Sequence, residues 1–152
     1  MTSIWRSLPL LATAWAGAAA AQATYEAGGQ ALVTTANPAL LTGGAYAAVR
    51  PSPRFRIAAT AGVGLSDGRA AGRGELLAHF LLSPTAAAGP GVYLGGGVAG
   101  VVGPVEQGYV VALIGIEAAP GGRSGWALEA GVGGGVRLTT GWRWRWRGAR
   151  KH

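Results

Sequence analysis

Residues 126–146 read WALEAGVGGGVRLTTGWRWRW, and the alternation in this stretch decides the fold. The even positions are mostly apolar or aromatic and end in Trp142, Trp144 and Trp146, while the charged residues occupy odd positions. Successive side chains of a β-strand point to opposite faces, so this period of two predicts one apolar face and one charged face. On a helix, Trp144 would point away from the other two rings. The stretch is therefore predicted to be β-structure.

The same alternation recurs upstream in four segments, 25–35, 54–65, 72–82 and 108–118, where charged residues share one parity and the large apolar residues mostly share the other. Proline, glycine, asparagine and aspartate gather between the runs and predict turns. Residues 126–146 would span more than twice a bilayer if they formed one extended strand, so a turn is expected at the glycines 133–135. The whole pattern predicts an all-β chain of eight antiparallel strands, each of about 9 to 13 residues.

Two segments fit this pattern less well. Residues 40–49 alternate poorly, and residues 69–82 could instead form an amphipathic helix, because Leu76, Leu77, Phe80 and Leu81 lie close together. Gly72 and Gly74 argue against that helix, since glycine weakens a helix interior. We expect strands in both places.

The composition indicates that water does not cover the whole surface. Hydrophobic residues make up 49% of the chain and charged residues only 12%, against about 25% in a typical soluble domain. The chain contains 28 glycines and no cysteine, which excludes disulfides and thiolate metal sites. Such a chain has too few polar side chains to coat itself, so a non-aqueous solvent is expected on one face.

The net charge of +7 is unevenly distributed along the chain. The last ten positions hold a cluster of basic residues, and the rest of the chain after Arg6 is nearly neutral; the cluster consists of Arg143, Arg145, Arg147, Arg150 and Lys151. A nucleic-acid-binding domain is usually basic over a whole face. We therefore expect no nucleic-acid partner.

The amino-terminal segment has the features of a secretory signal peptide. Arg6 supplies a positive charge, residues 8–21 are apolar but too short to span a bilayer, and Ala21-Gln22-Ala23 offers a cleavage site before Thr24. Cleavage after Ala21 is equally compatible with the sequence. The predicted organisation is a signal peptide at 1–23, a β-barrel at 24–147 and a basic tail at 148–152.

If the barrel lies in lipid, its charged face lines the lumen and its apolar face contacts lipid. The charged residues on the lumen parity are nearly balanced in sign, and arginine suits bidentate pairing in a confined space. The predicted lumen network consists of Glu26, Arg54, Arg56, Arg73, Glu75, His79, Glu117, Glu129 and Arg137.

Outward aromatic residues are predicted to collect at one end. When strands alternate in direction from a periplasmic amino terminus, the large rings of the apolar parity all fall at the periplasmic end, as in a membrane-interface girdle. These residues are Tyr25, Phe55, Phe80, Trp126, Trp142, Trp144 and Trp146.

The last run, 138–146, with alternate apolar residues ending in an aromatic one, resembles the carboxy-terminal signature of bacterial outer-membrane proteins. The chain as a whole resembles the small eight-stranded barrels of the OmpA and OmpX type. This resemblance implies a monomer in the bacterial outer membrane, with membrane lipid and the barrel-assembly machinery as partners. It covers nearly all of 24–146 as a pattern and carries over no functional residues. In this sequence Arg147 to His152 follow the final aromatic residue, where the class usually ends.

The sequence predicts neither an enzyme nor a cofactor or metal site. Residues 95–100 match G-x-G-x-x-G, but a proline-containing turn follows them instead of a helix, and His79 has no partners for a triad or zinc site. The expected role is structural, or that of a narrow pore for small solutes or ions, because several inward positions are small: Gly91, Gly95, Gly97, Ala99 and Gly131. The alternative is a soluble, exported periplasmic β-sandwich or barrel that binds a ligand or partner.

Overall fold

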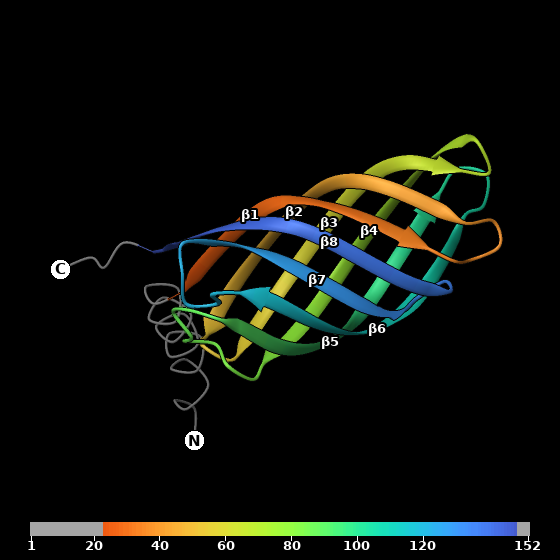
Figure 1. Cartoon of the computed structure of the whole chain (residues 1–152). Coiled ribbons are helices and arrows are strands. Elements are labelled where there is room, and N and C mark those ends of the chain that lie inside the picture. Colours follow the sequence, from red (N-terminus) through yellow and green to blue (C-terminus); the bar gives the residue numbers. More distant parts are fainter. Residues whose placement is uncertain (1–22, 149–152) are drawn as a thin grey trace, which may run out of the picture.

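A computed structural model describes residues 23–148, which form a closed barrel of eight antiparallel strands (Figure 1). Each strand pairs with the next along the chain, and β8 closes the barrel by pairing with β1. The strands are β1 (Thr24–Thr34), β2 (Leu40–Ser52), β3 (Phe55–Ser66), β4 (Arg69–Leu81), β5 (Pro90–Val102), β6 (Gln107–Ala118), β7 (Ser124–Val132) and β8 (Val136–Arg147). The predicted all-β architecture and strand number are confirmed.

The two uncertain segments are both strands. Residues 40–49 belong to β2, and all of residues 69–82 except the last form β4 rather than a helix. In β4 the side chains alternate strictly between buried and exposed from Arg73 to Leu81. Leu77 and Leu81 point inward and Leu76 and Phe80 outward, which accounts for the close spacing of large apolar residues in the sequence.

The connections are short and lie where turn residues occur. Asp67 and Gly68 join β3 to β4, both with positive φ (52° and 71°), which matches the twist of a two-residue hairpin. Gly133, Gly134 and Gly135 join β7 to β8, as predicted. We call the end where β1 begins and β8 ends the terminal end, and the opposite end, where these two glycine-containing turns lie, the far end.

The barrel places charged side chains inside and apolar ones outside. Arg56, His79 and Arg137 are completely buried, whereas Val63 and Val110 are 76% and 79% exposed. Among residues 23–148, no helix is long and apolar enough to cross a membrane. The predicted signal peptide, apart from Ala23, lies outside the described residues, as does the basic tail beyond Gly148.

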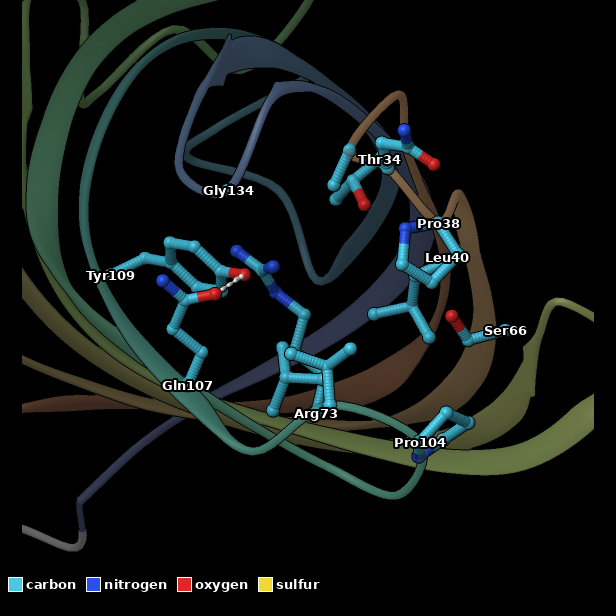
Figure 2. Close-up of a pocket in the computed structure, with 13 residues that line it drawn as sticks. Thr34, Pro38, Leu40, Ser66, Arg73, Pro104, Gln107, Tyr109 and Gly134 are labelled. Carbon is cyan, nitrogen blue, oxygen red and sulfur yellow. Dashed lines mark hydrogen bonds between the residues drawn. The ribbon is translucent and has the colours of Figure 1, made fainter.

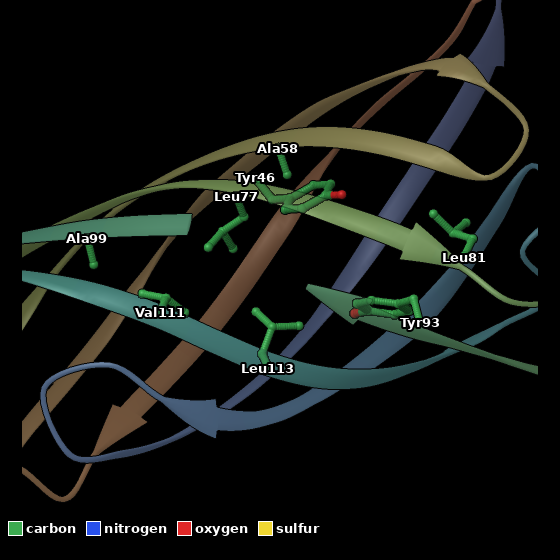
Figure 3. Close-up of a cluster of buried hydrophobic side chains, with 8 residues drawn as sticks. All are labelled: Tyr46, Ala58, Leu77, Leu81, Tyr93, Ala99, Val111 and Leu113. Carbon is green, nitrogen blue, oxygen red and sulfur yellow. The ribbon is translucent and has the colours of Figure 1, made fainter. Parts of the chain in front are cut away.

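One side of the interior is apolar (Figure 3). Side chains from β2 to β6 pack there into a buried cluster of Tyr46, Ala58, Leu77, Leu81, Tyr93, Ala99, Val111 and Leu113. Buried charged side chains from β1 to β4 and from β6 to β8 occupy the rest of the lumen. The interior is therefore a packed core with an apolar part and an ionic part, as expected when eight strands enclose a space that side chains can fill.

Candidate functional site

The ionic part of the interior is a continuous network drawn from seven strands. Its side chains share one parity of their strands, so alternation places them on one face, and closure of the barrel encloses that face. Six arginines and four glutamates are buried there: Arg50, Arg56, Arg73, Arg137, Arg143, Arg145, Glu26, Glu75, Glu117 and Glu129.

Glu117 on β6 is the hub of the network at the terminal end. Arg50 donates to its Oε1 from 3.1 Å, and Arg56 and Arg145 each donate to its Oε2 from 2.9 Å. Arg143 donates to the same Oε2 from 3.3 Å. One carboxylate thus neutralises part of the charge of four guanidinium groups from β2, β3 and β8.

Glu26 on β1 lies beside the hub and shares its arginines. It forms an ion pair with Arg50, and it lies 3.5 Å from Arg56 Nη1 and 3.6 Å from Arg145 Nε. The Tyr46 hydroxyl donates to Glu26 Oε2 from 3.2 Å. These contacts connect β1 to β2, β3 and β8 through side chains as well as through the sheet.

A second group of ion pairs extends toward the far end. Arg137 bridges two carboxylates, donating to Glu129 from 3.1 Å and to Glu75 from 2.8 Å. Arg73 also donates to Glu75, from 2.8 Å. Arg143 reaches Glu129 from 2.7 Å while contacting the Glu117 hub, so it joins the two groups.

Two tyrosine rings face the excess positive charge. The guanidinium carbon of Arg143 lies 4.3 Å from the centroid of the Tyr46 ring, and that of Arg56 lies 4.5 Å from the centroid of Tyr93. Cations are attracted to the faces of aromatic rings, more strongly when water is excluded. The rings therefore supply part of the compensation that four carboxylates cannot give to six arginines.

His79 belongs to the network as an uncharged hydrogen-bond acceptor. Its Nδ1 accepts a hydrogen bond from Arg56 Nε at 2.9 Å, and its ring lies 5.1 Å from that of Tyr93. Because an accepting ring nitrogen carries no proton, His79 orients Arg56 rather than forming an ion pair. Within 23–148, no three histidine, aspartate or glutamate side chains are grouped so that they could hold a metal ion.

Of the predicted lumen residues, only Arg54 lies elsewhere. It is exposed in the turn between β2 and β3, and the prediction of a lumen position for it is wrong. The β2–β3 register shifts between Val49 and Ser52, and β3 begins at Phe55, so the alternation of β3 does not extend back to Arg54. The other eight predicted residues are buried in the lumen.

The network includes residues that the predicted set omitted. Arg50, Arg143 and Arg145 lie on the parity that the sequence predicts for the charged face, and all three are buried. Tyr46 and Tyr93 were also missed. Both lie on the inward parity of their strands, but β2 and β5 are rich in small residues and show little contrast between their two faces.

The predicted outward aromatic residues are all exposed and all lie near the terminal end. Register places them in cross-strand pairs: Tyr25 opposes Trp146, Phe55 opposes Phe80, and Trp126 opposes Trp142. Trp144 opposes Ala27. We call Tyr25, Phe55, Phe80, Trp126, Trp142, Trp144 and Trp146 the aromatic girdle.

The small inward positions do not open a passage through the barrel. The ring of His79 occupies the space that a side chain at Gly95 would need, and the ring of Tyr93 does the same at Gly115. A water-wide channel past Arg56 and Arg137 would leave them exposed, yet both are fully buried. The expected solvated path is closed at the level of the network.

A small cavity opens at the far end of the lumen (Figure 2). It has a volume of about 40 Å³ and is lined by Thr34, Ser66, Arg73 and Tyr109, among others. The Tyr109 hydroxyl donates to the side-chain carbonyl of Gln107 from 2.9 Å. A cavity of this size holds a few water molecules, and so it is too small for a metabolite.

Comparison with known protein families and with curated proteins found no match to this chain.

Proposed function

We propose that this protein is an integral barrel of the bacterial outer membrane with a structural role, exported by a cleaved signal peptide. One observation carries the proposal, namely that the faces are inverted relative to a water-soluble barrel. Valines, leucines and tryptophans cover the outside, while six arginines and four glutamates are buried inside. In water this arrangement would expose the apolar face and bury charge, and both cost free energy. In a bilayer the apolar face is solvated by lipid.

Strand length and ring placement support the same proposal. The strands contain 9 to 13 residues, and a tilted strand needs about 9 to 11 to cross the hydrocarbon region. The girdle collects aromatic rings at one level, where amphipathic rings favour a membrane interface. In a soluble barrel no solvent boundary would favour one level over another.

A structural role is favoured over permeation because the lumen is filled by ion pairs. One observation supports permeation by small anions as a second candidate: the buried arginines outnumber the buried glutamates by six to four. Any passage would require Arg56, Arg137 and Arg143 to separate from their carboxylates. Such contacts are costly to break in a buried site, where each separated group loses its partner.

The proposal is tested by refolding the full chain into phosphatidylcholine vesicles. We expect the unheated protein to migrate differently from the heated protein on a denaturing gel, and to float with the vesicles in a density gradient. A soluble barrel would stay with the aqueous fraction and would contradict the proposal. In an expressing Gram-negative host, we expect the mature protein in the outer-membrane fraction with Thr24 or Gln22 at its amino terminus.

A further inference from the structure

The two rims of the barrel differ in charge. The rim at the terminal end has four sites, namely three turns and the end of β8, and exposed arginines occupy three of them: Arg54 in the β2–β3 turn, Arg123 in the β6–β7 turn, and Arg147 at the end of β8. The fourth site, residues 82–89, is uncharged, and no described rim residue at this end is acidic. At the far end the exposed charges are Asp67, Arg69 and Glu106. One rim is therefore purely basic and the other is slightly acidic.

The basic rim lies just beyond the aromatic girdle. Arg54 directly precedes Phe55, Arg147 directly follows Trp146, and Arg123 is three residues before Trp126. With about 3.3 Å of rise per residue, each backbone position is roughly 3 to 10 Å beyond a girdle residue along its strand. Among the described residues, the far end has no outward aromatic ring beside its charged residues.

The order of rings and arginines along the barrel matches the order of hydrocarbon and headgroup phosphates in an anionic lipid leaflet. If the girdle rings lie at the hydrocarbon boundary, the arginines lie at the level of the headgroup phosphates. A guanidinium group donates several hydrogen bonds in one plane and suits phosphate oxygens. Basic residues beside a membrane favour lipids whose headgroup carries net negative charge over zwitterionic ones.

We propose that Arg54, Arg123 and Arg147, together with the aromatic girdle, form a binding surface for anionic glycerophospholipid at the terminal end of the barrel. The proposal rests on the membrane insertion proposed above. Its partner is the phosphate of a lipid with net negative charge, such as phosphatidylglycerol. It gives the two rims different functions, because lipid selectivity is confined to the terminal end.

The girdle tryptophans provide a local reporter of the lipid beside them. Four of the six tryptophans, Trp126, Trp142, Trp144 and Trp146, belong to the girdle. In a full-chain W5F/W15F background the emission comes from these four alone. The protein is refolded into mixtures of phosphatidylcholine and phosphatidylglycerol in which one or the other lipid carries brominated chains. The quenching then yields the relative association of the two lipids with the girdle.

We expect phosphatidylglycerol to associate several-fold more strongly than phosphatidylcholine at low salt. A basic residue at a membrane surface contributes roughly a fivefold preference, which is diluted over the lipid sites around the girdle. The preference should weaken at high salt because the surface charges are screened. In a background in which Arg150 and Lys151 of the basic tail are already glutamine, the variant R54Q/R123Q/R147Q should bring the ratio close to one.

R147Q and R69Q form a matched pair for this experiment. Both arginines are exposed, and each is the terminal residue of its strand, but they lie at opposite ends of the barrel. R147Q should lower the preference and R69Q should leave it unchanged. An unchanged ratio in the triple variant, or equal losses in the matched pair, would overturn the proposal. Failure to insert into neutral vesicles would instead contradict the proposed function, so the two failures are distinguishable.

Discussion

The side chain on which the interior depends most is Glu117. Its carboxylate contacts Arg50, Arg56, Arg143 and Arg145, all of them buried. A buried ion pair adds little net stability over an apolar packing, but the loss of one partner leaves a charge without compensation. Removal of the Glu117 carboxylate would therefore leave the buried arginines around it without this counter-charge.

Replacing Glu117 by glutamine should destabilise the barrel by about 3–5 kcal/mol, because four buried guanidinium groups would lose a shared negative charge. The measurement is the urea midpoint of unfolding in phosphatidylcholine vesicles, followed by tryptophan fluorescence. Glu106→Gln is the matched control, since Glu106 is exposed in the β5–β6 turn and its substitution should change stability by less than about 0.5 kcal/mol. Equal midpoints for the two variants would show that the hub is dispensable.

Gly95 illustrates how small residues serve the packed interior. A Cβ at Gly95 would meet the His79 ring and lie 3.0 Å from Leu113 Cδ1, whereas a Cβ at Gly100, on the same strand, would meet nothing within 4 Å. Gly95→Ala should cost about 1–3 kcal/mol through overpacking, as measured by the same urea midpoint. Gly100→Ala is expected to be close to neutral. A destabilised Gly100→Ala with a neutral Gly95→Ala would contradict this packing.

At the scale of the strand, the pattern of alternation was sufficient to place most side chains. On β4, parity gives the inward positions of Arg73, Glu75 and His79. It also gives the outward position of Phe80. The exposed position of Arg54 did not follow from parity, because a turn interrupts the alternation one residue before β3. Parity is reliable inside a strand, and it fails at a boundary, which depends on pairing with the neighbouring strand.

Ile114 on β6 distinguishes a lipid-facing surface from a water-facing one. It is 51% exposed near the middle of its strand, so Ile114→Arg should cost about 2–4 kcal/mol if this face contacts hydrocarbon. Val136→Arg, at the far-end start of β8, should cost only about 0–1 kcal/mol. Unfolding in vesicles measures both. In a soluble barrel, arginine at an exposed position would be tolerated equally at both sites.

At the scale of the whole molecule, closure of the sheet turns a charged face into a sealed interior. β1 pairs with β8 along its whole length, from Thr24 opposite Arg147 to Thr34 opposite Arg137. This pairing leaves no free sheet edge and surrounds the ion pairs on every side. This pairing also brings Arg145 of β8 to within 3.6 Å of Glu26 of β1, so an ion pair links the first strand to the last.

A sealed lumen should conduct no ions. In planar-bilayer recordings, we expect no conductance steps from protein whose folding was verified by heat-modifiable migration. Y93A/R143A removes a fully buried ring and the guanidinium that joins the two ionic groups, and it should allow intermittent steps. Regular steps from the unmodified chain would instead favour the permeation role.

The sequence by itself determined that the chain forms β-strands, where most turns lie and which side chains share a face, because alternation and turn residues act over a few neighbouring positions. Alternation alone could not determine which face is enclosed, since a period of two is the same for a barrel of either orientation. Only the tertiary structure decided that the charged face is inside, that the small inward glycines make room for His79 and Tyr93, and that Glu117 gathers arginines from three other strands. Those contacts join residues 26 to 67 positions apart, and strand pairing and closure alone bring them together.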